Sequence, residues 1–388
     1  MRLSTVRGSR TTSTDYTMRR AAVLFSGGLG KPQLRPKNCR LRRGNSPAVT
    51  PAGEQQGHAT GRLARTRGGE PMASDFEHRP VMLDEVLETF EPLGSGLIVD
   101  ATVGGGGHAD AILSQHPGRR LLGLDRDPEA IRAAGRRLAQ HGDRASLARC
   151  RFDAVGSLLD DPANTGGEPF VGALFDLGVS SPQLDRGDRG FSHRFDGPLD
   201  MRMDPDGPLA AAQVVNDYEH GALARLLRLY ADEPHARRIA AAIVAARPIL
   251  STGQLAEVVV EAVPAAARRR GRHPAMRTFQ AIRIEVNDEL AAIEPALTAV
   301  IDRLEPGGRV VVIAYHSGED RIVKHVLRQA ADGVCECPSG LPCICGAGPS
   351  VRLLRRKVRR PMPVEVAANP RAASARFRSA ERLAVGEY

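Results

Sequence analysis

After an irregular start, the chain alternates short apolar runs with amphipathic stretches. The runs LIVDAT (97–102), RLLGLDRD (120–127) and VGALFDLG (171–178) have the length and apolarity of buried strands. The stretch HADAILSQH (108–116) carries apolar residues at helical spacing, and Pro128 stands where the first residue of a second helix is expected. This alternation predicts an α/β fold with a parallel, doubly wound sheet and right-handed crossovers.

From about residue 209 to about residue 300 the strand patterns disappear. Ala, Leu, Arg and Glu dominate this stretch, which predicts helices. The strand pattern returns at GGRVVVIAYHS (307–317), and two further strands are expected near 351–358 and 375–383. A helical segment therefore interrupts the sheet pattern.

Two segments that lie far apart in the sequence are expected to form one domain. We assign residues 72–184 and 286–388 to the α/β domain, and residues 185–285 to an inserted all-helical domain that recognises substrate. Residues 1–71 show no apolar periodicity, and we assign them to neither domain.

The net charge of +9 is concentrated at the start of the chain. Residues 1–71 hold 14 of the 54 Lys and Arg residues but only 3 of the 45 Asp and Glu residues, which leaves residues 72–388 with 40 basic against 42 acidic side chains. A segment this polar cannot bury enough apolar surface to fold, so we expect it to be disordered. It is either a basic arm that binds RNA or sequence upstream of a start at Met72.

Neither a signal peptide nor a membrane-spanning run is recognisable, so a soluble, cytoplasmic protein is expected. Two further basic clusters, RRRGRH (268–273) and RLLRRKVRR (352–360), are either solvated faces or surfaces that bind phosphate groups.

The stretch DATVGGGGH (100–108) places a carboxylate and four glycines after the first strand. Glycine permits a sharp turn and lets a ligand approach the N–H groups at a helix N-terminus. Such a turn occurs in sites for NAD and for S-adenosylmethionine (AdoMet), and a tight turn without a ligand is the alternative.

Three more residues near strand ends are candidates for cofactor contacts. Asp125 could accept hydrogen bonds from both ribose hydroxyls of an adenosine cofactor, while its neighbour Asp127 is expected to cap the next helix. Asp176 closes an apolar strand at the edge where ligands bind in open α/β sheets. Phe152 could pack on adenine or belong to the core.

Longer strings in this order resemble the bacterial 16S rRNA (cytosine-N4)-methyltransferase family across about residues 78–382. The strings are HRPVMLDEVL, DATVGGGGHADAIL, GLDRDPEAI, FDLGVSSPQLDRGDRGFSHRFDGPLDMRMD, HPAMRTFQAIRIEVNDEL, YHSGEDRIVK and NPRAASARFRSAER. The resemblance implies a class I (Rossmann-like) AdoMet-dependent methyltransferase. It implies 16S rRNA as the partner and, as the substrate, a cytidine at the decoding centre of the small ribosomal subunit.

The same resemblance implies a set of cofactor contacts, two of which, His108 and Gln183, rest on it alone. The full set is Gly106, Gly107, His108, Asp125, Phe152, Asp176 and Gln183.

Methylation of an exocyclic amine requires that the nitrogen be held in line with the methyl group. Backbone carbonyls of residues 179–182, including Ser181 and Pro182, are candidates for this role. Asp200 and His316 are candidates for proton acceptance, with structural ion pairing as the alternative for each.

Other side chains of the polar segment could contact RNA or organise the fold. Phe191 and Phe195 could stack on a base drawn out of the RNA. Arg277 and Asn287 are expected to organise the junction between the helical segment and the sheet.

Four cysteines, Cys335, Cys337, Cys343 and Cys345, fall within eleven residues. Four thiolates so close could form a tetrahedral zinc site, although the spacing is not the usual one. A reduced surface hairpin and a redox-sensitive cluster are the alternatives.

Two other functions fit parts of the pattern. An NAD-dependent oxidoreductase fits the glycine turn but lacks an evident partner for hydride transfer. A non-catalytic ribosome-assembly factor that binds AdoMet also fits. The sequence does not decide whether the protein forms a homodimer.

Overall fold

The computed structural model describes residues 41–42, 79–269, 271, 273–333, 337, 348–384 and 386. Their strands form one sheet in the order β1-β4-β3-β2-β5-β6-β8-β7. Strands β4, β3, β2, β5 and β6 run parallel, β8 is antiparallel to both β6 and β7, and β1 is antiparallel to β4. The strands are β1 (Leu41–Arg42), β2 (Gly96–Asp100), β3 (Arg119–Asp125), β4 (Ala145–Arg149), β5 (Phe170–Asp176), β6 (Arg309–Ala314), β7 (Val351–Leu353) and β8 (Arg376–Arg382).

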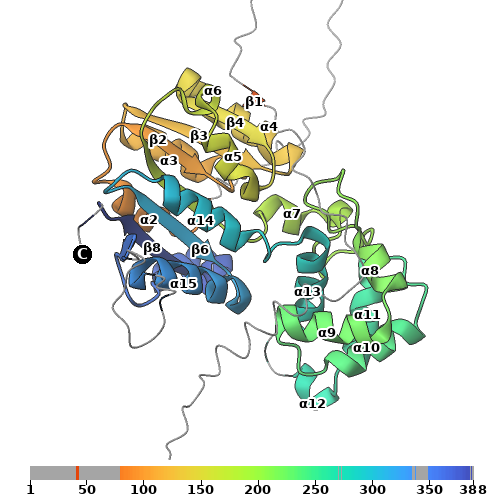
Figure 1. Cartoon of the computed structure of the whole chain (residues 1–388). Coiled ribbons are helices and arrows are strands. Elements are labelled where there is room, and N and C mark those ends of the chain that lie inside the picture. The colour runs from red at the N-terminus through yellow and green to blue at the C-terminus, as the bar shows by residue number, and fades with distance from the viewer. Residues whose placement is uncertain are drawn as a thin grey trace, which may run out of the picture. The chain divides into compact units, whose positions relative to one another are not determined.

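Helices cover both faces of this sheet (Figure 1). Apolar side chains of one group of helices pack on one face, and those of a second group pack on the other. The first group is α5 (Val155–Leu159), α14 (Ile293–Arg303) and α15 (Ser317–Asp332); the second is α2 (Leu83–Phe90), α3 (Gly107–Gln115) and α4 (Pro128–Leu138). The five parallel strands with helices on both faces confirm the expected Rossmann-like class I methyltransferase sheet, while the antiparallel β8 was not expected.

A separate hydrophobic cluster belongs to the helices between β5 and β6, drawn in green and teal in Figure 1. Their amphipathic faces pack on one another. The main helices are α8 (Ala211–Asp217), α9 (His220–Ala231), α10 (Ala236–Ala245), α11 (Thr252–Ala262) and α13 (Met276–Asn287).

Shorter helices complete the described residues. They are α6 (Pro162–Thr165), α7 (Ser181–Asp185), α12 (Ala265–Arg268) and α16 (Pro363–Ala368), with 3-10 turns η1 (Ala139–Arg144), η2 (Phe152–Ala154), η3 (Gly187–Arg189) and η4 (Pro370–Ser374).

Two expectations need correction. Between α7 and α8 the chain is not helical apart from η3, because its buried side chains, among them Met201 and Met203, pack as a loop against the helical cluster. Strand β1 lies in the segment expected to be disordered; the rest of residues 1–78 lies outside the described part of the chain.

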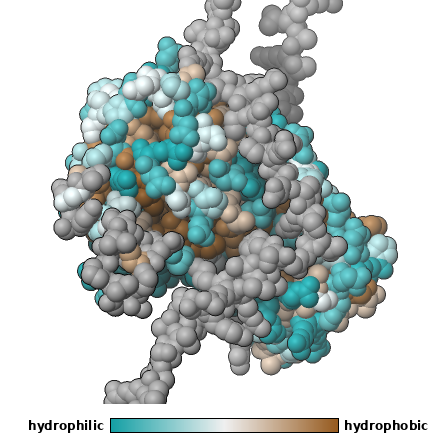
Figure 2. All heavy atoms as spheres, in the orientation of Figure 1, coloured by the Kyte–Doolittle hydropathy of each residue, from teal (hydrophilic) through white to brown (hydrophobic). Residues whose placement is uncertain are grey.

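The expected strands are otherwise found, although β7 has only three residues. In the described residues, no helix combines the length and apolarity needed to cross a bilayer. Figure 2 shows mainly hydrophilic residues over the helical cluster on the visible face.

Candidate active site

Acidic residues end three neighbouring parallel strands. Asp100 closes β2, Asp125 closes β3 and Asp176 closes β5. Since β2 lies between the other two strands and parallel strands end at one edge of the sheet, the three carboxylates face one region. The charges of Asp125 and Asp176 help to raise the pKa of Asp100.

The glycine turn lies at the same edge and leads into α3. Gly106 has a φ of +82°, which favours glycine, and it precedes the first residue of the helix. A Cβ on Gly107 would lie 2.6 Å from Cγ of Pro80, so a larger residue would not fit there. The turn therefore depends on residues without side chains at Gly106 and Gly107, whereas nothing lies within 4 Å of where a Cβ would stand on Gly105.

Backbone N–H groups fix the position of Asp125. Its Oδ2 accepts a hydrogen bond from the N–H of Gly104 at 3.1 Å, and its Oδ1 accepts one from the N–H of Asp127 at 2.8 Å. Burial raises the pKa of Asp125 to about 6, and these hydrogen bonds oppose the shift. The side chain thus joins the glycine turn to the start of α4.

Asp100 is the most deeply buried of the three carboxylates, with 1% of its surface exposed. Burial raises its pKa to about 7, while nearby His108 and the N–H of Thr102 act in the opposite direction. Asp100 was not singled out as a site residue from the sequence. The available signal was its place as the last residue of a wholly buried strand.

Asp176 is held by a tyrosine from the neighbouring strand end. The hydroxyl of Tyr315, which follows β6, donates a hydrogen bond of 2.8 Å to Oδ1 of Asp176. Burial and the Asp176 carboxylate raise the pKa of Tyr315, so the hydroxyl keeps its proton. Nothing in the local sequence distinguished Tyr315 from a core residue.

His108 lies in the first turn of α3 and is 6% exposed. Its Nε2 is 3.6 Å from Oδ2 of Asp176. Neither ring nitrogen has a hydrogen-bond partner within the described residues. A buried imidazole without partners commonly faces a ligand or water.

Asp127 confirms the expected helix cap and also anchors α7. Its Oδ1 accepts from the N–H of Glu129 in the first turn of α4. Its Oδ2 accepts from Nε2 of Gln183 at 2.9 Å and lies 3.1 Å from Nη1 of Arg189. Gln183 also accepts from the N–H of Ser180 in a capping box, so both ends of its amide are engaged.

The aromatic candidates have different surroundings. Phe152 is half-buried, and its ring meets the core residue Phe175 edge-on at 5.9 Å. Phe191 is only 4% exposed and packs in the helical cluster, so the expectation that it stacks on a base is wrong. Phe195 is 46% exposed and stays available.

Both proton-acceptor candidates have structural contacts. Burial would raise the pKa of Asp200, but its hydrogen bonds with Arg202 hold the pKa below the usual value. Nδ1 of His316 accepts from the N–H groups of Gly318 and Glu319 and caps α15, and its Nε2 lies 3.1 Å from the Glu319 carboxylate. These contacts favour the structural alternative for each.

Ser181 and Pro182 begin α7 directly after the loop that leaves β5. Pro182 is exposed and Ser181 is half-buried. Of the carbonyls expected to be available, that of Ser180 accepts from the N–H groups of Gln183 and Leu184. The helix therefore engages that oxygen.

Three of the four clustered cysteines, Cys335, Cys343 and Cys345, lie outside the described residues, whereas Cys337 is described. Within the described part of the chain, no three His, Cys, Asp or Glu side chains come together as metal ligands would.

The arrangement fits AdoMet by its chemistry. Nothing lies within 4 Å of where a Cβ would stand on Gly105 in the glycine turn, and Asp125 offers carboxylate oxygens of the kind that accept ribose hydroxyls. Three acidic strand ends favour a ligand with positive charge, which a sulfonium supplies, and disfavour the pyrophosphate of NAD. Asp125, Asp176 and the glycine turn are the residues that would hold the cofactor.

Comparisons with known proteins give the family. A family model described as the MraW methylase family matches residues 75–383. Ribosomal RNA small subunit methyltransferase H of Heliobacterium modesticaldum is 49% identical over 79% of this chain and 99% of its own. The protein of the same name from Salinispora tropica is 52% identical over 79% of this chain and 84% of its own.

Among solved structures, an rRNA methylase from Streptococcus thermophilus matches 78% of this chain and 94% of its own, with 13% identity and a TM-score of 0.33. The family assignment does not depend on this overlap. It follows from the family model and the sequence relatives: the chain belongs to the MraW methylase family.

Proposed function

We propose that this protein transfers a methyl group from AdoMet to the exocyclic N4 of a cytidine in the decoding centre of 16S rRNA. The observation that carries the proposal is the group of acidic strand ends around a glycine turn, in a chain whose relatives are named ribosomal RNA small subunit methyltransferase H. The proposed substrate is 16S rRNA within the small subunit, and the proposed location is the cytoplasm.

AdoMet supplies an electrophilic methyl group on a sulfonium. The proposed binding residues are the turn at Gly106 and Gly107 with Asp125 for the ribose. Half-buried Phe152 would flank the adenine. Gln183 would hold α7 beside the cofactor through its hydrogen bond to Asp127. His108 of α3 lies beside Asp176 at the end of β5.

We assign the orientation of the substrate amine to the backbone that follows Asp176. The lone pair of the cytosine amine is delocalised into the ring, so the amine must be held and its N–H groups need acceptors. We assign this role to the backbone at Ser181 and Pro182, while the Asp176 carboxylate, fixed by Tyr315, would hold the cofactor beside it.

A strong base is not required, because the amine proton becomes acidic as methyl transfer begins. Asp200 and His316 remain the side-chain candidates for proton acceptance. The lowered pKa of Asp200 makes it a weak base, and the Nδ1 of His316 serves as a helix cap. Solvent water would be a sufficient acceptor.

The helical region, residues 185–285, is proposed to bind the RNA around the target cytidine. Phe195 is its exposed aromatic side chain closest in sequence to α7. A homodimer remains a prediction that light scattering would test.

The first test is Asp176→Ala, with Asp302→Ala on the exposed side of α14 as the control. Asp176→Ala should abolish measurable AdoMet binding in calorimetry, whereas Asp302→Ala should bind as the wild type does. Near-normal affinity of Asp176→Ala for AdoMet would refute the assignment.

The reaction itself is tested by mass spectrometry of 16S rRNA from cells with and without the protein. Loss of one N4-methylated cytidine is expected in its absence. AdoMet binding without any change in the rRNA would indicate the assembly-factor alternative instead.

A further inference from the structure

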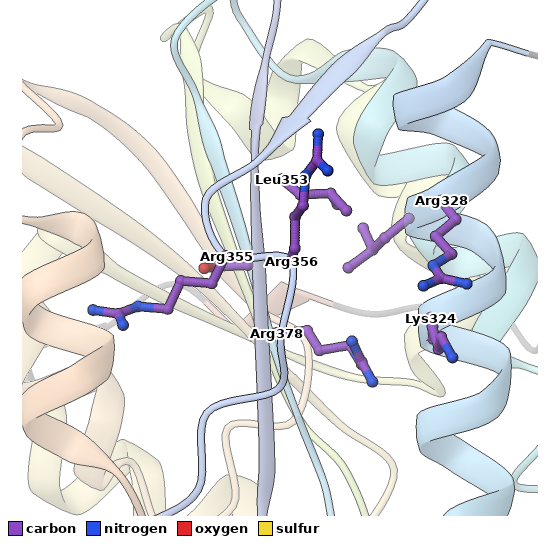
Figure 3. Close-up of a pocket in the computed structure, with 8 residues that line it drawn as sticks. Lys324, Arg328, Leu353, Arg355, Arg356 and Arg378 are labelled. Carbon is purple, nitrogen blue, oxygen red and sulfur yellow. The ribbon is translucent and has the colours of Figure 1, made fainter.

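A small pocket lies between α15 and the strands β7 and β8, outside the site described above. Five of the eight residues that line it are basic and none is acidic. Figure 3 shows Lys324 and Arg328 on α15 opposite Arg378 of β8, with Arg356 above them. The side chain of Arg355 points away from Lys324, Arg328 and Arg378.

Protein carboxylates neutralise only part of this charge. Asp320 accepts from Nε of Arg378 at 2.7 Å and from its Nη2 at 3.2 Å, which fixes that guanidinium in place. Lys324, Arg328 and Arg356 have no acidic partner among the described residues. All three are exposed.

The uncompensated charges repel one another in the folded state. Lys324 and Arg328 are four residues apart on one helix, a spacing at which like charges are destabilising. These exposed side chains line one pocket together with the fixed Arg378. An anion in the pocket would relieve this repulsion.

The size of the pocket restricts the anion. The enclosed space is about 10 Å³, too small for a nucleobase, and no aromatic side chain lines it. Small anionic oxygen groups could therefore bind the basic side chains at the rim of the pocket. A base would find no aromatic ring there on which to stack. Phosphate oxygens fit this chemistry.

The pocket lies near the proposed active site along the sheet. Arg378 pairs with Val312 of β6, and β6 leads to Tyr315, which contacts Asp176. Lys324 lies seven residues into α15, roughly 10 Å from its first turn. An RNA strand with one nucleotide at the crevice can reach the pocket within a few nucleotides.

We propose that Lys324, Arg328, Arg356 and Arg378 bind the phosphodiester backbone of the rRNA next to the target cytidine. This inference rests on the proposed function and adds a second contact surface to it, on the sheet domain rather than on the helical region. The contact is independent of base identity, so it sets affinity and register.

The test uses the full chain with Arg328→Gln and Arg356→Gln combined, and Arg136→Gln, an exposed arginine on α4, as the control. Initial rates of methylation are measured with small subunits and with 16S rRNA fragments, between about 50 and 200 mM salt. Calorimetric AdoMet affinity and melting temperature check that the variants are folded.

The double variant should raise KM for RNA about tenfold, with kcat and AdoMet affinity nearly unchanged. The salt dependence of kcat/KM should weaken by about 0.7 in log–log slope per lost phosphate contact. Arg136→Gln should change neither.

Equal KM and equal salt slope in the double variant and the control would overturn the inference. An effect with small subunits but not with naked RNA would also overturn it, because it would indicate an acidic ribosomal protein as the partner. If the wild type methylates no RNA, the proposed function fails instead, and fluorescence anisotropy with a 16S rRNA fragment still tests the pocket.

Discussion

At the scale of single residues, the carboxylates at the sheet edge differ in burial and in hydrogen-bond partners. Asp100 is almost wholly buried beside two other acidic strand ends. Asp176, in contrast, is partly exposed and receives a hydrogen bond from Tyr315. These differences lead to two predictions.

The first concerns pH. The pKa of Asp100 is raised from 3.8 to about 7, so the folded protein binds this proton more tightly than the unfolded chain. The stability from this proton is complete below the unfolded pKa and is lost as pH rises through about 7. The melting temperature, measured by calorimetry, should therefore fall as pH rises across this range. In Asp100→Asn it should fall less, and an equally steep fall would contradict the shift.

The second prediction concerns Tyr315→Phe, which removes the hydroxyl that donates to Asp176. Activity should fall about tenfold, because one hydrogen bond to a charged group is lost. The control is Tyr218→Phe, which removes a hydroxyl bonded to Glu285 in the helical cluster. Tyr218→Phe should lower the free energy of unfolding about as much as Tyr315→Phe does, without affecting AdoMet affinity. Similar activities of the two variants would argue against a positioning role for Tyr315.

At the scale of elements, one carboxylate joins the start of α4 to α7. Asp127 caps α4, accepts from Gln183 of α7 and pairs with Arg189 of η3. The loop after β5 is therefore fixed to the loop after β3, which brings the two sides of the proposed crevice into a defined position.

Asp127→Ala should lower the free energy of unfolding by roughly 2–3 kcal/mol, because α4 loses its cap and the buried Gln183 amide loses its acceptor. Asp127→Asn keeps an oxygen for the cap and should cost less. Urea denaturation measures both. Equal losses in the two variants would show that the charge of Asp127 contributes little.

At the scale of the whole described molecule, Asn287 connects the helical cluster with the sheet. Its side chain bonds Met201 and Met203 in the loop, and its carbonyl accepts from Arg126 after β3. This bears out the expected junction role of Asn287. Arg277 instead bonds the carbonyl of Asp232 within the helical group.

Asn287→Ala should lower the free energy of unfolding by about 2–3 kcal/mol, since buried partners lose hydrogen bonds. It should also raise KM for RNA, because the loop would no longer be tied to α13. Asn216→Ala removes a similar pair of bonds, to Ile249 within the helical cluster. It should destabilise the protein while leaving KM nearly unchanged, as steady-state kinetics would show.

The sequence alone determined the succession of strands and helices along the chain, the cap at Asp127 and the acidic ends of β3 and β5. These follow from periodicity and from residue preferences at helix starts, which depend on near neighbours in the chain. The family membership was also within reach of sequence patterns, whereas the antiparallel direction of β8 was not predicted.

Only the tertiary structure decided what the side chains contact. The burial of Phe191, the pairing of Tyr315 with Asp176 and the grouping of Lys324 with Arg378 each join residues whose meeting no local pattern encodes. Such contacts depend on how distant elements pack and on which polar groups remain unsatisfied when they do. Periodicity specifies which face of an element is buried, but the partner on that face is fixed only when the chain folds.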